Sequence, residues 1–439
     1  MSDSASLADV RHNPEPVTEP ERLIAIDTLR GIAVLGILVM NIYAFAMPFV
    51  AYQNPLAYGG SEWYNLGTWF FTHIFFDQKF MTIFSMLFGA GLVMMMTRAQ
   101  ARGSAYGSTW YRRNFWLLLI GAAHGYLLWV GDILFHYAVV GMLIYPLRNR
   151  TPRTLISTGC VLLLFGMLMA YAGGSQMLNL QASSAEVLAL QDAGEKLTEA
   201  QSAILDQWNE MAIFMKPPEE QVAEDMAAYT GDYKGMFQHR ATTVVMMQTQ
   251  GLIGFVLWRV GGLMLIGMAF MKLGIISGQR STSFYRRMMM FGYGLGLPGT
   301  LYSAWSLQAH QWDMTYIFRT GGQANYVASI LVAFGHIALV MLIFKSGGLT
   351  RMMDRFAAVG RMAFTNYLMH SIILTTVFYG YGFGFFGQVE RAWQMAIVAA
   401  VLSFQLWLSP LWLTHFRFGP AEWLWRSLTY WHLQSMRRQ

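Results

Sequence analysis

Long apolar runs separated by short polar segments are the dominant pattern along the chain. A helix that crosses a bilayer needs about 20 consecutive apolar residues, and ten stretches reach or approach that length. The pattern therefore predicts an all-α bundle of about ten transmembrane helices. These stretches are residues 25–49, 64–97, 113–131, 133–147, 154–172, 243–271, 284–306, 322–344, 358–384 and 393–415.

Polar segments divide the apolar stretches into two sets of five. Residues 1–22 are polar and contain three prolines, which predicts a disordered cytoplasmic tail. We expect five helices within residues 23–172 and five more within residues 243–416, followed by a cytoplasmic C-terminal tail over residues 417–439. The segment between the two sets, residues 173–242, is the longest polar one.

Residues 173–242 have a helical pattern and carry eleven acidic residues against four basic ones. Ser183 to Glu186 fits a capping box at the start of a helix. Pro217-Pro218-Glu-Glu indicates a break followed by a new helix. We therefore expect two or three short helices that form a small extracytoplasmic cap, with a solvated linker as the alternative interpretation.

The apolar stretch 64–97 is too long for one simple crossing. As a single helix it would measure about 50 Å at 1.5 Å per residue, against a hydrocarbon core of about 30 Å. Asp77-Gln78-Lys79 lies in its middle. Either the helix breaks there, or a long tilted helix turns these polar residues toward a cavity.

Composition supports a membrane protein and excludes several other classes. Of the 439 residues, 55% are apolar and 12% are charged, about half the charged fraction of soluble domains. The mean hydropathy is +0.36. These values exclude an ordinary cytosolic enzyme, a disordered chain and a coiled coil. Cys160 is the single cysteine, so the chain has no intrachain disulfide and no cysteine-based metal site.

The basic residues indicate which side of the membrane each connecting segment faces. With the N-terminus inside and ten crossings, the inside segments hold 22 of the 30 Lys and Arg residues. This asymmetry follows the positive-inside rule and predicts a multi-pass membrane protein with both termini in the cytoplasm. It also accounts for the net charge of +6 without a nucleic-acid partner.

Several ionisable side chains fall within the predicted spans, where they are costly and are candidates for function. His124 is the most informative, because Asp132 follows it by about two helical turns and so lies on roughly the same face. An imidazole beside a carboxylate suits general-base catalysis and, equally, a proton relay. No His and carboxylate spacing supports a metal site, so we expect no bound metal. The other ionisable residues at or near membrane depth are Asp27, Arg30, Asp77, Lys79, His136, Arg259, His336 and His370.

These residues can also have purely structural roles, as three of them illustrate. Asp27 and Arg30 are three residues apart and can pair on one helix face. Arg259 can neutralise Asp77 or Asp132 as a buried ion pair.

Five segments, taken together, resemble the YeiB family of bacterial inner-membrane proteins. The resemblance runs over nearly the whole chain and does not by itself imply a substrate. The segments are Asp27-Thr-Leu-Arg-Gly-Ile-Ala-Val-Leu-Gly-Ile-Leu-Val-Met-Asn41, Lys79-Phe-Met-Thr-Ile-Phe-Ser-Met-Leu-Phe-Gly-Ala-Gly91, His124 followed by Gly131-Asp-Ile-Leu134, Gly360-Arg-Met-Ala-Phe-Thr-Asn-Tyr367 and Gly419-Pro-Ala-Glu-Trp-Leu-Trp-Arg-Ser-Leu-Thr-Tyr430.

The first span is also similar, more remotely, to that of transmembrane acyltransferases of the heparan-α-glucosaminide N-acetyltransferase type. The shared features are Asp27-x-x-Arg30-Gly and an asparagine, Asn41. Such enzymes deliver an acyl group from cytoplasmic acyl-CoA to an acceptor across the membrane. The resemblance implies that Asp27, Arg30 and Asn41 line a membrane-embedded donor site. Unlike the heparan enzyme, this chain has no histidine in residues 50–63, and His73 is the nearest.

We therefore expect an acyltransferase-like protein that moves an acyl group from acyl-CoA, as co-substrate, to an envelope lipid or glycan. His124, supported by Asp132, is the expected general base, and Asn41 and Lys79 are expected to stabilise an oxyanion. A polar cavity is expected between the first, second, third, sixth and ninth spans. The residues expected to hold the CoA phosphates are Arg30, Arg98, Arg112 and Arg113. The residues expected to bind substrate are Asp27, Arg30, Asp77, Arg259, Arg361, Asn366 and His370.

Two other functions remain open from the residues alone. A transporter would use the same buried charges as a proton or solute pathway. A non-catalytic protein would bind membrane lipids in its grooves, or would form a homodimer.

Overall fold

The computed structural model describes residues 23–104 and 106–438, and the predicted tail 1–22 lies outside them. Within these ranges every regular element is helical, apart from one isolated bridge between Phe416 and Arg437. The all-α prediction is therefore confirmed. The first helices are α1 (Ile24–Ala46), α2 (Val50–Gln53), α3 (Trp63–Phe75), α4 (Lys79–Ala101), α5 (Gly107–Leu127) and α6 (Leu134–Ile144), followed by a 3₁₀ turn (Tyr145–Asn149).

The remaining elements complete the bundle and a projecting part. They are α7 (Pro152–Asp192), α8 (Glu199–Met215), α9 (Glu219–Thr230), α10 (Tyr233–Met246), a π-helical segment (Met247–Val256), α11 (Leu257–Lys272), α12 (Thr282–Ala309), α13 (Met314–Tyr316), a second π-helical segment (Ile317–Gly321), α14 (Gly322–Ser346), α15 (Thr350–Arg361), α16 (Ala363–Phe378), α17 (Arg391–His415) and α18 (Pro420–Tyr430).

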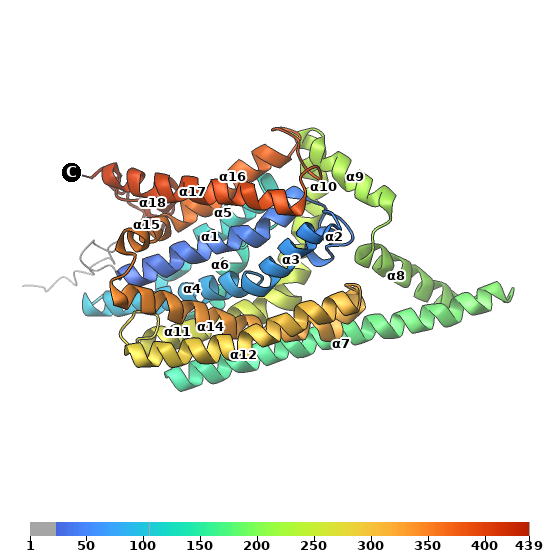
Figure 1. Cartoon of the computed structure of the whole chain (residues 1–439), viewed down its shortest axis with the longest axis horizontal. Helices are drawn as coiled ribbons and strands as arrows, with labels where there is room; N and C mark the ends of the chain where they lie inside the picture. The colour runs from blue at the N-terminus through green and yellow to red at the C-terminus, as the bar shows by residue number, and fades with distance from the viewer. Residues whose placement is uncertain (1–22, 105, 439) are drawn as a thin grey trace, which may run out of the picture.

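The helices run side by side along the long axis of the molecule, with α1 among the others (Figure 1). The start of α1 and helix α18 lie at one end of the bundle, called here the terminal end. The opposite end is called the far end, and α7 extends beyond it. Most of α1 is buried, because its apolar side chains pack against helices all round it.

Six helical segments of the described chain are long and apolar enough to cross a membrane. The predicted number of ten crossings stays a prediction, since several other helices are shorter or less apolar. The six segments are Ile24–Ala46, Trp63–Ala101, Pro152–Asp192, Tyr233–Lys272, Met314–Ser346 and Arg391–His415.

The long stretch 64–97 breaks in its middle, which decides between the two sequence interpretations. Helix α3 ends at Phe75 and α4 begins at Lys79. Gln78 stands between them with a left-handed φ of 63°, a conformation that a continuous helix cannot contain. The break turns Asp77 and Lys79 into the bundle, where both are buried.

The segment 173–242 differs from the prediction in where its first helix begins. Residues 183–186 lie inside α7, so the predicted capping box at Ser183 is wrong. The capping box is at Thr198, where α8 begins and where Gln201 supplies the reciprocal bond. The predicted break at the two prolines is confirmed, because α8 ends at Met215 and α9 starts at Glu219.

The C-terminal tail expected over residues 417–439 contains a helix that packs back onto the bundle. Trp425 of α18 donates a hydrogen bond from its indole nitrogen to the carbonyl of Arg113 on α5 (2.8 Å). Pro420 at the first helical position gives the helix a favourable start. Helix α18 therefore packs against α5 at the terminal end of the bundle.

Candidate functional site

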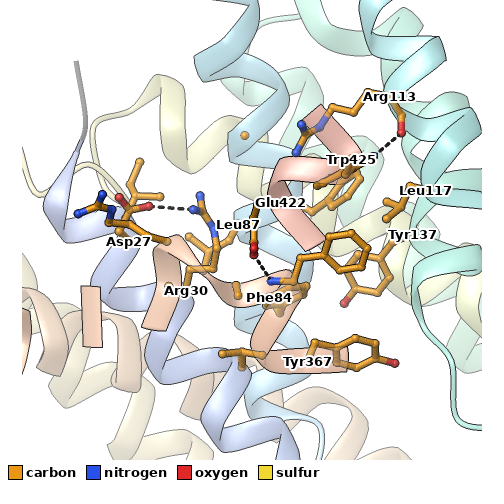
Figure 2. Close-up of a pocket in the computed structure, with 18 of the residues that line it drawn as sticks. Asp27, Arg30, Phe84, Leu87, Arg113, Leu117, Tyr137, Tyr367, Glu422 and Trp425 are labelled. Atoms are coloured by element: carbon orange, nitrogen blue, oxygen red, sulfur yellow. Dashed lines mark hydrogen bonds and ion pairs between the residues drawn. The ribbon is translucent and has the colours of Figure 1, made fainter. Parts of the chain in front are cut away.

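A cavity of about 210 Å³ lies at the terminal end of the bundle (Figure 2). Four series of residues line it in the same way, each with an arginine near the terminal end and apolar side chains about one to three turns farther in. The series are Arg30, Val34 and Ile37 on α1, Arg98, Met94 and Leu87 on α4, Arg113 and Leu117 on α5, and Arg361, Phe364 and Tyr367 across α15 and α16. The cavity is therefore basic at its mouth and apolar inside.

Five guanidinium groups and two carboxylates supply the charge at the mouth. Arg30 forms an ion pair with Asp27, which lies one turn earlier on α1 (2.8 Å). The guanidinium of Arg113 stacks over the Trp425 ring at 3.5 Å from its centre. Helix α18 also contributes an arginine, Arg426, to the mouth. With Arg98 and Arg361 the mouth carries an excess of positive charge, which favours an anionic group there.

Glu422 is the second carboxylate of the cavity, and it caps α16 from α18. Its carboxylate accepts hydrogen bonds from the backbone nitrogens of Phe364 (2.7 Å) and Thr365 (3.1 Å), and from the Thr365 hydroxyl (2.5 Å). These nitrogens belong to the first turn of α16, which has no side-chain cap of its own. Burial raises the pKa of the Glu422 carboxyl. The sequence interpretation did not include this residue.

His124 and Asp132 meet as predicted from their spacing. His124 Nδ1 lies 2.7 Å from Asp132 Oδ2, and both residues are buried. The other carboxylate oxygen, Oδ1, accepts a hydrogen bond from the backbone nitrogen of Phe135 at the start of α6 (2.9 Å). The carboxylate is thus held in place on the turn between α5 and α6, and it fixes the orientation of the imidazole.

A serine completes this cluster, and sequence reasoning missed it. Ser371 on α16 places its Oγ 2.8 Å from His124 Nε2 and is 1% exposed. The signal was a polar stripe at helical spacing, Tyr367, Ser371 and Thr375, on one face of α16. The Tyr367 ring, which lines the cavity, lies 5.3 Å from the His124 ring, centre to centre. The cluster therefore sits directly behind the inner wall of the cavity.

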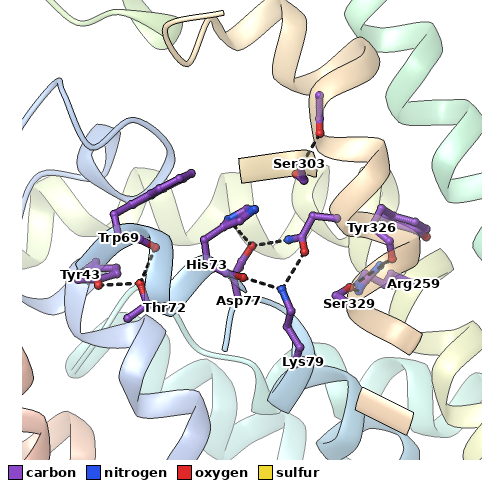
Figure 3. Close-up of polar contacts among 12 residues, drawn as sticks. Tyr43, Trp69, Thr72, His73, Asp77, Lys79, Arg259, Ser303, Tyr326 and Ser329 are labelled. Carbon is purple, nitrogen blue, oxygen red and sulfur yellow. Dashed lines mark hydrogen bonds and ion pairs between the residues drawn. The ribbon is translucent and has the colours of Figure 1, made fainter. Parts of the chain in front are cut away.

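A second buried polar cluster gathers around the break between α3 and α4 (Figure 3). Lys79 Nζ donates to the carbonyl of His73 (2.6 Å) and to Asn325 Oδ1 on α14 (2.8 Å). Asn325 in turn donates to Asp77 Oδ2 (2.6 Å), and His73 Nδ1 lies 3.4 Å from the same oxygen. Asp77 and Lys79 are thus bridged by one amide, so they belong to a cluster other than that of His124.

Arg259 lies nearby but forms neither of the ion pairs considered from the sequence. Its guanidinium donates to the carbonyl of Tyr326 (2.9 Å) and to the hydroxyl of Ser329 (2.8 Å), both on α14 (Figure 3). A carbonyl and a hydroxyl replace the carboxylate that we expected. Helix α11, which carries Arg259, does not contribute to the lining of the cavity.

The other candidate residues are placed as follows. His370 Nε2 lies 2.8 Å from Gln405 Oε1, and Asn366 donates to the carbonyl of Val359 and to the hydroxyl of Ser409, so both connect α16 with its neighbours. Asn41 is partly buried on α1 and is absent from the lining of the cavity.

Arg112, unlike its neighbour Arg113, is outside the cavity lining, and its guanidinium stacks over the Trp431 ring at 4.4 Å. His136 Nε2 lies 2.9 Å from the carbonyl of Met247, where the first π-helical segment begins. His336 contacts the hydroxyl of Tyr293 and the carbonyl of Phe75. Across the described ranges, no group of three or more His, Cys, Asp and Glu residues is arranged to hold a metal ion.

Comparison with known proteins relates nearly the whole chain to one family. A family model described as protein of unknown function DUF418 matches residues 270–432. The uncharacterized protein YeiB of Escherichia coli (strain K12) is 31% identical, over 93% of this chain and 96% of its own length. The uncharacterized protein YxaH of Bacillus subtilis (strain 168) is 29% identical, over 95% and 96%. A sequence with these relatives, and with the helical bundle and motifs described above, belongs to the YeiB family.

Proposed function

We propose that this protein is an acyltransferase-like protein of the bacterial inner membrane. It would take an acyl group from acyl-CoA on the cytoplasmic side and pass it to an envelope lipid or glycan. The observation that carries the proposal is the division of the cavity into a basic mouth and an apolar interior. A molecule that joins phosphates to a narrow chain fits that division.

The charges at the mouth suit the nucleotide part of the donor. CoA carries phosphates on a nucleotide and an acyl chain at the end of a flexible arm. Arginine binds phosphate through paired, charge-assisted hydrogen bonds, and Arg30, Arg113 and Arg426 come from three separate helices around the mouth. The apolar side chains of Val34, Leu87 and the residues around them would then contact the arm and the acyl chain.

The buried imidazole supplies the chemistry of the proposal. His124 lies behind Tyr367 at the inner end of the cavity, with Asp132 holding its Nδ1. A neutral imidazole oriented by a carboxylate accepts a proton from an attacking hydroxyl. Lys79 and Asn41, the expected oxyanion stabilisers, are outside the cavity lining, and Lys79 is bonded within the second cluster. We therefore assign the proton transfer to His124 and leave Lys79 out of the mechanism.

The adjacent residues Arg112 and Arg113 give the proposal a matched test. Acetyl-CoA, longer acyl-CoAs and free CoA would be titrated into detergent-purified protein, with binding followed by calorimetry and by thermal shift. We expect Arg113→Gln to weaken binding at least tenfold, because a phosphate contact at the mouth is lost. Arg112→Gln, which removes the same charge outside the cavity, should bind like the wild type.

Two results would contradict the donor assignment. One is the absence of binding by any of these ligands to a folded sample. The other is equal weakening by both substitutions, which would indicate a diffuse surface charge effect.

Transport is the second candidate function, and the broken α3–α4 segment favours it. Interrupted helices at membrane depth provide ion and substrate sites in many transporters, and Asp77 and Lys79 stand at this break. Loss of acyl-CoA binding together with a proton or solute flux that Asp77→Asn abolishes would support this function instead.

A further inference from the structure

Ser371 is the one hydroxyl in contact with the buried imidazole, among the hydrogen bonds of the described residues. Asp132, His124 and Ser371 form an unbroken chain, with 2.7 Å between the carboxylate and Nδ1 and 2.8 Å between Nε2 and Oγ. When Nδ1–H donates its hydrogen bond to the carboxylate, Nε2 is left as the acceptor for the serine hydroxyl. A base that is oriented by a third group and bonded to a hydroxyl is the arrangement that activates a nucleophile.

His124 and Asp132 are close in the sequence, whereas Ser371 is 247 residues from His124 and reaches it only through the packing of the helices. His124 is near the end of α5, Asp132 is on the following turn, and Ser371 is in the middle of α16. Asp132 has a second anchor at the Phe135 nitrogen. The carboxylate and the imidazole are therefore fixed with respect to each other, and the serine is presented from the opposite helix.

The Tyr367 ring lies between the cavity and the Asp132–His124–Ser371 hydrogen bonds. A substrate in the cavity would therefore reach Ser371 past this ring. It lies one turn before Ser371 on the same face of α16. Its hydroxyl contacts are long, 3.3 Å from the backbone nitrogen of Ile133 and 3.5 Å to the carbonyl of Gly131. Long hydrogen bonds of this kind are weak, so the buried Tyr367 ring is held mainly by apolar packing and by its contact with the His124 ring.

We propose that Ser371 is a covalent carrier of the acyl group, and this rests on the acyl transfer proposed above. Ser371 Oγ attacks the thioester carbonyl carbon, forming a C–O bond and breaking the C–S bond. Its proton passes to His124 Nε2 and then to the departing thiolate. An acceptor hydroxyl next attacks the serine ester, its proton goes to His124, and His124 returns a proton to Ser371 Oγ. The products are a free thiol and the acylated acceptor.

If Ser371 carries the acyl group, a donor and an acceptor from different compartments can both use His124 as their base, one after the other. The donor leaves the cavity after the first step, and the acceptor needs to reach only the serine ester. Direct transfer would instead require both substrates beside His124 at the same time.

The test uses the full-length protein in lipid nanodiscs and two reagents. The first is an alkyl fluorophosphonate, which reacts with activated serines and does not depend on acyl-CoA. The second is a radiolabelled acyl-CoA, quenched in acid. Peptide mass spectrometry locates each adduct. We expect both reagents to modify Ser371, with at least a tenfold lower rate of fluorophosphonate labelling in His124→Ala.

Controls separate reactivity from folding. Ser409→Ala removes another buried serine, bonded to Asn366 rather than to an imidazole, and should leave labelling unchanged. Ser371→Ala should lose both adducts. Ser371→Cys keeps a nucleophile at the same place and should accept the acyl group as a thioester that hydroxylamine releases.

The outcomes distinguish this inference from the proposed function. Fluorophosphonate labelling of Ser371 without any reaction with acyl-CoA would keep the serine as a nucleophile and remove acyl-CoA as the donor. Turnover of acyl-CoA that is unchanged in a folded Ser371→Ala variant, with no adduct in the wild type, would overturn the covalent carrier and keep the acyltransferase. Labelling at a different serine, or at none, would also overturn it.

Discussion

At the scale of single residues, Glu422 has two roles, because it lines the cavity and also stabilises the fold. It lines the mouth among the arginines and also caps the start of α16 through Phe364 and Thr365. Loss of a side-chain cap costs about 1 kcal/mol in proteins generally. Because α16 carries Tyr367 and Ser371, the same carboxylate positions the inner wall of the cavity.

The raised pKa of Glu422 makes a pH-dependent prediction. The folded protein holds this proton more tightly than the unfolded chain does, because the carboxyl is buried. Its contribution to stability is therefore complete below the unfolded pKa, about 4.3, and is lost as the pH rises through the folded pKa. We expect the melting temperature of the wild type to fall relative to that of Glu422→Gln over a pH range that starts at the unfolded pKa and extends upward.

Differential scanning fluorimetry of both proteins across that range would measure the effect. Glu195→Gln, which removes an exposed carboxyl beyond the end of α7, controls for the loss of one negative charge. A difference between the wild type and Glu422→Gln that stays constant with pH, or that changes in the opposite direction, would contradict the prediction.

Residue contacts close in the sequence were predictable, and distant ones were not. The eight-residue spacing of His124 and Asp132 predicted a contact that the structure confirms at 2.7 Å. Ser371 and Asn325 are each more than two hundred residues from their partners, so no local periodicity could place them. His124 and Lys79, which we expected in one site, make their hydrogen bonds in two different clusters for the same reason.

At the scale of helices, α4 and α11 pack so closely that their backbones touch. A Cβ atom on Gly89 would lie 1.9 Å from the carbonyl oxygen of Met264, and one on Gly267 would lie 2.0 Å from that of Met86. Two glycines on opposite helices thus form a reciprocal contact. Close approach through small residues is a main source of helix association in membranes.

This contact predicts opposite effects at two neighbouring glycines. Gly89→Ala should destabilise the protein by about 1–3 kcal/mol, because backbone atoms have no alternative position. Gly91→Ala, whose Cβ would meet only the end of Met95 at 3.7 Å, should be neutral or stabilising by up to about 1 kcal/mol through helix propensity. Thermal unfolding in detergent compares the two, and equal melting temperatures would refute the packing argument.

Helix starts and ends show which signals the sequence carries. The break near Asp77 was visible because polar residues interrupt an apolar run. The length of α7 was not visible, because its apolar pattern ends near residue 172 while its helix continues to Asp192. Leucine, alanine and glutamine in residues 173–192 have high helix propensity, so the helix continues beyond its apolar stretch.

At the scale of the whole molecule, the structure shows which ends of the helices lie together at each end of the bundle. The start of α1 and helix α18 lie at one end, and the loop after α7 lies beyond the other (Figure 1). We expect a green fluorescent protein fused after the C-terminus to fluoresce, and alkaline phosphatase inserted at Gly194 to be active, because the positive-inside rule predicts a cytoplasmic position for the basic end. The reverse pattern of reporter activity would contradict this orientation.

The length of α7 has a practical consequence for imaging. Its 41 residues measure about 60 Å at 1.5 Å per residue, twice the thickness of a hydrocarbon core of about 30 Å. With the headgroup layers a bilayer is about 40–45 Å thick, so about a quarter to a third of the helix, with α8 beside it, would extend beyond it. A 49.7 kDa membrane protein usually offers an electron microscope only a featureless disc. This asymmetric projection gives each particle a recognisable direction, so images can be aligned without a bound antibody fragment.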